Sequence, residues 1–151
     1  MFFSRRSNAV KRSCITRLLV VEDDPLVAFD HELDLKGAGY TLVATVNSGE
    51  AAVAVLAEDS IDAVVLDLHI AGTINGEDVA RLAFDRGIAV LLVSGDAPGP
   101  ASQYAFGHLG KPLHHGALVG ALRAMERQLC KGEAPREVGG LTIFAPAAPD
   151  V

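Results

Sequence analysis

An aspartate follows a short apolar stretch near the middle of the chain. Residues 63–66 are all apolar, and Asp67 comes directly after them. A Val-rich run of this length is typical of a strand buried on both faces of a parallel sheet. The carboxyl end of such a strand is where open α/β sheets bind ligands. We therefore predict that Asp67 is a nucleophile for a phosphoryl group, although a lone aspartate there is more often a turn or helix-cap residue.

Further polar side chains follow other apolar runs of the chain. They are Glu22, Asp23, Ser94 and Lys111. Because the carboxyl ends of parallel strands meet at one edge of a sheet, we expect these groups to surround Asp67. Their presence together, rather than Asp67 alone, favours a reactive site over a structural turn.

Three neighbouring carboxylates imply a cation. Glu22, Asp23 and Asp67 would all be ionised at neutral pH, and such a cluster is unfavourable without a positive charge among them. Oxygen ligands around a small open site favour Mg²⁺, which also takes a phosphate oxygen. The Lys111 ammonium would neutralise the transferred group further, and the Ser94 hydroxyl would donate a hydrogen bond to it. Phosphoryl transfer requires mainly positioning and charge stabilisation, so this set suffices.

The elements that position these residues alternate between strand and helix. Apolar runs predict strands at 17–22, 40–46, 63–66, 88–93 and 107–110. Periodicity and capping residues predict helices at 25–37, 48–58, 77–87 and about 114–130, with only a short helix inside 97–106. The expected buried rows are Leu26, Phe29 and Leu33 in the first helix and Leu118, Leu122, Met125 and Leu129 in the last. Five rounds of strand and helix indicate a three-layer α/β domain.

Composition and charge restrict the function classes. The chain has 151 residues, 50% of them hydrophobic, which is enough for one domain with a substantial core. Residues 1–17 carry five basic and no acidic side chains, whereas the remainder carries eight basic and 19 acidic ones, a net charge of −11. This acidic body argues against nucleic acid as a partner, and no apolar run reaches the ~20 residues of a membrane span. Cys14 and Cys130 show no metal or redox spacing, so we expect free thiols in a reducing cytoplasm.

Three segments divide the chain. Residues 1–16 are basic, lack the apolar region of a secretory signal, and are expected to form a disordered arm. Residues 17–130 hold the α/β domain. Residues 131–151 are rich in Gly, Pro and Ala and are expected to form a flexible tail with no effector domain. The apolar patch 141–144 in that tail is either loose or docked, on a partner or on its own domain.

Four segments resemble the signature segments of response-regulator receiver domains from two-component systems. In chain order, they are Leu18–Pro25, Leu66–Leu68, Val93–Gly95 and Lys111–Pro112. Each is common by itself, but four in this order at successive strand ends are specific, and the resemblance covers about residues 17–130. It implies a flavodoxin-like, doubly wound sheet of five parallel strands in the order 2-1-3-4-5, with helices on both faces.

The resemblance also implies roles for the acidic residues. Asp67 would be phosphorylated by a sensor histidine kinase or a histidine phosphotransfer protein. Asp23 and Asp67 would bind Mg²⁺ directly, with the backbone carbonyl of His69 as a third ligand and Glu22 acting through water. His69 and Asp96 would occupy two positions that tune the rate of dephosphorylation.

Further implied roles concern the response to phosphorylation. Ser94 and Lys111 would contact the phosphoryl group, and the Lys111–Pro112 peptide bond would be cis. Ser94 would then move inward, and His108, three residues before the lysine, would follow as the switch side chain. The plain alternative for His108 is an edge-strand residue without a switching role.

The chain departs from the family pattern in two loops. The residue four positions after Asp67 is usually proline but is Ala71 here, and Gly76 comes one residue later than the usual glycine. The segment from Ser94 to Lys111 is also short, so we expect a short fourth helix. Because that helix belongs to the family's usual output surface, we expect that this protein does not dimerise or signal through that face in the common way.

We therefore predict a single-domain response regulator. It is not an enzyme, because it catalyses only its own phosphoryl transfer and dephosphorylation. The expected partner is a downstream protein in the cytoplasm, without nucleic acid or membrane, and a homodimer is left open. The alternatives are a pseudo-receiver that is never phosphorylated and a phosphohydrolase of the haloacid-dehalogenase type. The hydrolase requires a second aspartate two residues after the nucleophile, where this chain has His69.

Overall fold

The structure, a computed structural model, describes residues 14–144 of the chain. Its strands are β1 (Arg17–Val21), β2 (Thr41–Val46), β3 (Ala63–Asp67), β4 (Ala89–Ser94), β5 (Gly107–Gly110) and β6 (Leu141–Ile143). Its helices are α2 (Pro25–Gly37), α3 (Gly49–Glu58), α4 (Gly76–Asp85) and α5 (Ala117–Lys131), with a short 3-10 helix, η1, at Gly99–Tyr104. The predicted alternation of strand and helix is therefore confirmed, as is the short helix before β5.

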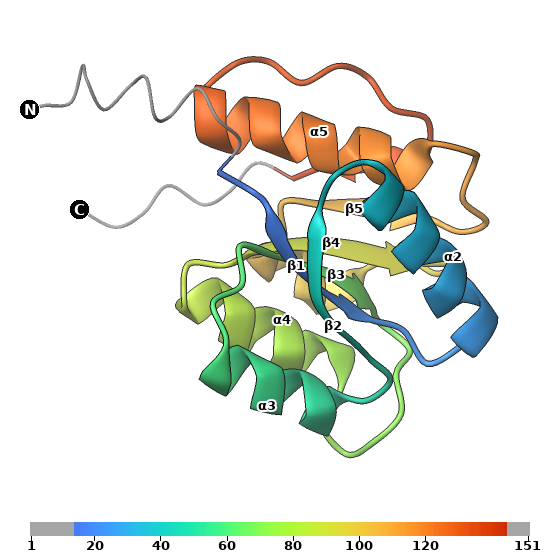
Figure 1. Ribbon diagram of the computed structural model, residues 1–151, viewed down its shortest axis with the longest axis vertical. Helices are drawn as coiled ribbons and strands as arrows, with labels where there is room; N and C mark the ends of the chain where they lie inside the picture. The colour runs from blue at the N-terminus through green and yellow to red at the C-terminus, as the bar shows by residue number, and fades with distance from the viewer. Residues whose placement is uncertain (1–13, 145–151) are drawn as a thin grey trace, which may run out of the picture.

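The strands form one sheet in the order β2-β1-β3-β4-β5-β6. Strands β1 to β5 are parallel, which confirms the predicted order 2-1-3-4-5, and β6 is an antiparallel addition at the edge. Figure 1 shows β1 and β3 side by side in the middle of the molecule. The order of strands reverses between these two, and the crevice at their carboxyl ends is where sheets of this kind bind ligands.

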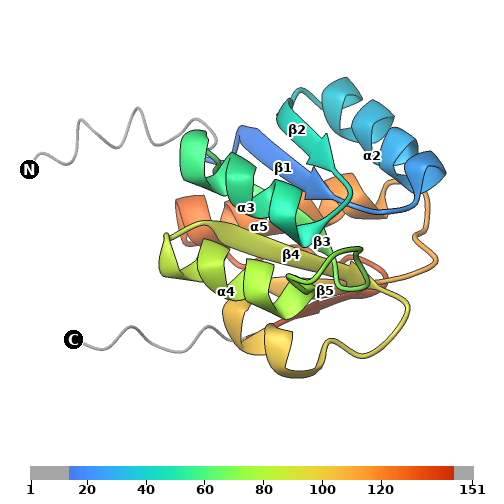
Figure 2. The same cartoon turned by 90° about the horizontal axis from the view of Figure 1, so that it is seen from below.

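Side chains of the central strands alternate between two apolar layers. Leu18 and Val20 of β1 belong to the layer covered by α2 and α5, whereas Leu19 and Val21 belong to the layer covered by α3, α4 and η1. All four are buried, as expected for a parallel strand covered on both faces. The predicted placement of helices on both faces is confirmed, and Figure 2, viewed from the α3–α4 side, shows α5 behind the sheet.

Local capping determines the turn after β1. The Asp24 carboxylate accepts hydrogen bonds from two backbone N–H groups in the first turn of α2, and Pro25 occupies the first helical position. Both features favour a helix start, because the cap satisfies free N–H donors and proline lacks one. Glu22 and Asp23, which precede the cap, are consequently held at the carboxyl end of β1.

The predicted buried row of α2 is wrong. Leu26, Phe29 and Leu33 are 77%, 56% and 57% exposed, whereas His31 and Leu35 are buried. The helix carries apolar residues on two sides, so periodicity alone could not choose between them. The side of α2 that carries Leu35 faces the sheet, and Leu35 belongs to the apolar layer covered by α2 and α5.

Helix α5 begins three residues after the predicted start at about 114. Leu118, Leu122 and Met125 are buried as predicted, but Leu129 is 47% exposed and that expectation is wrong. Leu129 lies in the last turn of α5, where it lines a surface hollow with Ala89 of β4.

The expectation of free thiols is also wrong, because Cys14 and Cys130 form a disulfide. The two cysteines are 116 residues apart in the chain, but their Cα atoms are 5.7 Å apart, where the approach to β1 meets the last turn of α5. Spacing along the sequence could not reveal this pair, since a disulfide depends on distance in the fold. The argument from free thiols to a reducing compartment therefore no longer holds.

Part of the predicted tail adds a strand to the sheet. Strand β6 pairs with β5 over residues 107–109, so the apolar patch is docked on its own domain. Gly107 permits this approach, because a Cβ there would lie 2.7 Å from the backbone oxygen of Thr142. The sequence had left this docking as one of three alternatives.

The ends of the chain lie outside the described residues. Of the predicted basic arm, 1–16, only residues 14–16 are described, and the last residues of the tail, 145–151, are not. Within residues 14–144, none of the helices has the length and apolar character needed to cross a membrane.

Candidate functional site

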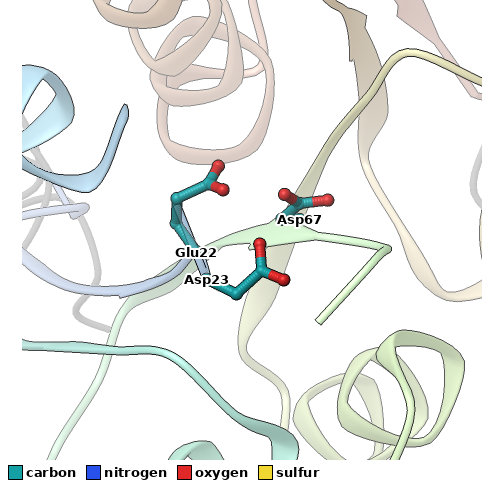
Figure 3. A group of neighbouring side chains, drawn as sticks. All are labelled: Glu22, Asp23 and Asp67. Carbon is teal, nitrogen blue, oxygen red and sulfur yellow. The ribbon is translucent and has the colours of Figure 1, made fainter. Parts of the chain in front are cut away.

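Three carboxylates converge at the carboxyl ends of β1 and β3. Carboxylate oxygens of Glu22, Asp23 and Asp67 all lie within 4.8 Å of one another. Figure 3 shows the three side chains gathered around one space. Glu22 and Asp67 are 3% and 5% exposed, whereas Asp23 is open to solvent. The cluster therefore has a buried floor and a solvent-facing side by which an ion or a reactant can approach.

The Lys111 ammonium lies between the two buried carboxylates. Its Nζ donates to Glu22 Oε1 at 2.9 Å and to Asp67 Oδ2 at 3.1 Å. Lys111 directly follows β5, its backbone N–H donates to the Ser94 carbonyl at 2.9 Å, and its peptide bond to Pro112 is cis. These contacts bring a positive charge to the carboxylate of Asp67.

Burial affects both charged partners. It raises the pKa of Glu22 above its usual value, and this effect outweighs the hydrogen bond from Lys111. Burial alone would lower the pKa of Lys111, but the hydrogen bonds to Glu22 and Asp67 outweigh it, and the pKa of the ammonium is raised. Lys111 is therefore charged at neutral pH, and a second cation would relieve the remaining repulsion among the carboxylates.

The donor atoms suit a hard divalent cation. The three side chains of the cluster offer only carboxylate oxygens, which favours Mg²⁺ or Ca²⁺ over the softer transition metals. The backbone N–H of His69 donates to Asp67 Oδ1 at 2.9 Å, so the chain stays close to the cluster after Asp67. The His69 imidazole instead contacts the Asp96 carboxylate at 2.9 Å in solvent. The His69 carbonyl as a metal ligand stays a prediction.

Ser94 and His108 are joined by a hydrogen bond. Ser94 ends β4 and is 1% exposed. Its hydroxyl donates to the Asp96 carbonyl at 2.6 Å and lies 2.9 Å from His108 Nε2. Because the serine proton is committed to Asp96, His108 must be the donor, which assigns the ring proton to Nε2. Burial lowers the pKa of His108, which favours this neutral ring.

A buried histidine that was not predicted from the sequence lies beside the cluster. His31 is 4% exposed, its Nε2 lies 3.9 Å from Glu22 Oε1, and this nitrogen has no hydrogen-bond partner within the described residues. Burial and then the charge of Lys111 lower the pKa of His31, so its ring is neutral. The predicted buried row of α2, Leu26, Phe29 and Leu33, would have placed His31 on the exposed side of the helix. Only the spacing of His31 and Leu35, four residues apart, could have indicated that His31 is buried.

The chain is similar in sequence to response regulators. The family model of the response regulator receiver domain matches residues 18–123. The DNA-binding response regulator MtrA of Mycolicibacterium smegmatis is 31% identical over 140 residues, which make up 87% of this chain. The chain spans about 60% of the length of that curated relative.

Solved structures share the fold. A CheY-like response regulator receiver domain protein from Methanospirillum hungatei is 19% identical, with a TM-score of 0.68, covering 78% of this chain and 98% of that one. The response regulator TrrA of Thermotoga maritima, in complex with Mg²⁺-BeF, is 24% identical, with a TM-score of 0.65, covering 72% of this chain and 96% of that one. At these identities, the likeness concerns the fold.

Proposed function

The chain belongs to the response regulator receiver domain family, and we propose that Asp67 is its phosphoryl acceptor. The observation that carries this proposal is the contact of buried Asp67 with Lys111 inside a group of carboxylates that could hold a metal ion. One oxygen of Asp67 accepts from Lys111 and the other from the His69 N–H, so both are oriented before the reaction. Receiver domains are signalling modules, and the only reactions proposed for this one are its own phosphorylation and dephosphorylation.

The proposed phosphodonor is the phosphohistidine of a sensor histidine kinase or of a histidine phosphotransfer protein. An Asp67 oxygen attacks phosphorus, the phosphorus–nitrogen bond breaks, and the donor imidazole keeps the electron pair. Lys111 holds its charge beside the transferred group. Asp23, Asp67 and the His69 carbonyl, with Glu22 acting through water, would hold a Mg²⁺ ion, which would supply charge neutralisation. The Mg²⁺ in the TrrA complex supports this choice of metal.

Ser94 and His108 form the proposed switch. Without phosphate, the Ser94 hydroxyl is shared between the Asp96 carbonyl and His108. A phosphoryl group on Asp67 offers a charged acceptor, which makes a stronger hydrogen bond than a neutral one. Ser94 then leaves its present partners, and His108 loses the group that holds its ring. Because His108 pairs with Thr142 of β6, the change passes along β5 to the edge of the sheet.

The proposed output is contact with a downstream protein. The relative MtrA binds DNA, as its name states, but residues 18–151 of this chain carry a net charge of −11, which favours a protein over a nucleic acid. Strand β6 covers the edge of β5, and η1 is short. We therefore expect the surface near Ser94 and His108 to differ from the family's usual output surface. We assign the protein to the cytoplasm together with its phosphodonor, and a homodimer is left open.

Intact mass spectrometry after incubation with acetyl phosphate and Mg²⁺ tests the proposal. We expect a gain of one phosphoryl group in the wild type and none in Asp67→Asn or with a chelator. Asp85→Asn, at the exposed end of α4, is the matched control and should gain the group normally. Uptake by Asp67→Asn would disprove the assignment of the acceptor, and no uptake by the folded wild type would favour a pseudo-receiver that acts by binding alone.

A further inference from the structure

The loop between β3 and α4, residues 68–75, is anchored to the first turn of α3. Oε2 of Glu50 accepts hydrogen bonds from the Thr73 N–H at 2.9 Å, the Thr73 hydroxyl at 2.5 Å and the Ile74 N–H at 3.3 Å. These hydrogen bonds lower the pKa of Glu50 to about 2, and the bond from the Thr73 hydroxyl has the largest effect. The Glu50 carboxylate is therefore charged at neutral pH. One side chain thereby satisfies three donors of a loop that has neither helix nor strand.

Two glycines allow the loop to approach α3 closely. A Cβ on Gly49 would lie 2.0 Å from the Ile74 carbonyl oxygen, and a Cβ on Gly72 would lie 2.0 Å from Glu50 Oε1. Gly72 also has a φ of +101°, which favours glycine. The Gly49 N–H donates to the Ala71 carbonyl at 3.3 Å, so the loop is held at a second point. The fit between loop and helix is therefore built by backbone as well as by Glu50.

The anchored loop starts at the carboxylate cluster. Asp67 ends β3, and the next contact is the His69 N–H on its Oδ1. Only one residue separates His69 from Ala71, so the position of the anchored part limits where the His69 backbone can lie. The family's usual proline, absent at Ala71, would restrict this loop through its fixed φ. In this chain, hydrogen bonds from α3 supply that restraint.

We propose that Glu50 is a positioning residue for the phosphorylation site: it holds residues 71–74 so that the His69 backbone is oriented toward a bound metal ion. The inference rests on the proposed function, because the ion concerned is the Mg²⁺ of the carboxylate cluster. Groups that orient metal ligands from outside typically change metal affinity by roughly 10–100-fold. Glu50 would act in this way through the backbone of the loop.

The helices on either side have caps of their own. The Ser48 side chain caps α3 by accepting from the Ala51 N–H, and Asn75 and Asp78 form a capping box at the start of α4. Loss of Glu50 therefore leaves both caps in place and releases the loop between them. This separates a positioning role from a general role in stability.

Calorimetric titration of the full chain with MgCl₂ tests the inference without a phosphodonor. Glu50→Ala should weaken Mg²⁺ binding about tenfold, at the lower end of the range for such groups. Glu50→Gln retains an oxygen that can accept from Thr73 and should recover most of the affinity. Glu58→Gln, at the exposed end of the same helix, removes the same charge and should bind Mg²⁺ like the wild type.

Amide hydrogen exchange supplies a structural readout. In Glu50→Ala, the Thr73 and Ile74 amides should exchange faster, while amides inside α4 keep their protection. Wild-type Mg²⁺ affinity in Glu50→Ala would overturn the inference and leave the proposed function intact. Equal weakening in Glu58→Gln would assign the effect to net charge and would also overturn it. Absence of Mg²⁺ binding by the wild type would overturn the proposed Mg²⁺ site and this inference together.

Discussion

Replacement of Lys111 by methionine tests the electrostatic account of the site. Lys111→Met keeps the aliphatic stem but leaves Glu22 and Asp67, with side chains 2% and 6% exposed, without their shared cation. Hydrogen bonds to charged groups contribute about 1.5–3 kcal/mol each, and two are lost. The Lys111 side chain is 26% exposed, so water offsets part of the loss. We expect the free energy of unfolding to fall by about 2 kcal/mol without Mg²⁺.

Urea unfolding followed by circular dichroism, in chelator and in saturating MgCl₂, measures this change. The loss should shrink with Mg²⁺, because a cation then lies among the carboxylates in both proteins. Lys36→Met, exposed in the last turn of α2, is the control and should change stability by less than about 0.5 kcal/mol. A similarly small change for Lys111→Met in chelator, or an equal loss with and without Mg²⁺, would refute the reasoning.

The pH dependence of the same variant has a defined sign. Burial raises the pKa of Glu22 in the folded protein, so the folded state binds this proton more tightly than the unfolded state. Stability from this group is greatest below the unfolded pKa of about 4.3 and falls as pH rises through the folded pKa. Lys111→Met removes the bond that opposes this rise. Its free energy of unfolding should therefore fall more steeply than that of the wild type as the pH rises above the unfolded pKa of about 4.3.

Two further predictions concern the disulfide and the switch. Joint replacement of Cys14 and Cys130 by serine should lower the free energy of unfolding by about 2–4 kcal/mol, because the bond joins residues 116 apart. A reductant should lower the free energy of unfolding of the wild type by the same amount and leave that of the double variant unchanged. An unchanged free energy of unfolding of the wild type in reductant would contradict a stabilising disulfide. His108→Phe should raise the initial rate of phosphorylation by acetyl phosphate about fivefold, since the Ser94 hydroxyl loses one of its two hydrogen bonds, about 1 kcal/mol, and keeps only the bond to Asp96. A time course of intact mass measures this rate, and an unchanged rate would argue against the switch.

The elements and the location of the carboxylate cluster were predictable because their signals are local. Runs such as 63–66 identify strands covered on both faces, and a cap such as Asp24 identifies a helix start within a few positions. Polar residues at successive strand ends then indicate the site, since parallel strands share one carboxyl edge. The strand order followed from the resemblance of four segments to a known family.

The orientation of α2 depended on what the helix packs against. Both of its sides carry leucine, so hydrophobic periodicity gave no unique answer. Contact with the apolar layer selects the side of Leu35, which also brings His31 beside Glu22 and leaves Phe29 in solvent. For this reason the position of His31 could not be predicted from the sequence.

Contacts between distant segments were decided by tertiary structure alone. The disulfide joins Cys14 to Cys130, and β6 pairs with β5. Glu50 reaches across to Thr73 in the loop after β3. None of these pairs has a spacing or period that the sequence could display, because their proximity results from the packing of whole elements. The sequence by itself determined the family and the polar residues expected around Asp67, and the folded chain determined which distant groups restrain them.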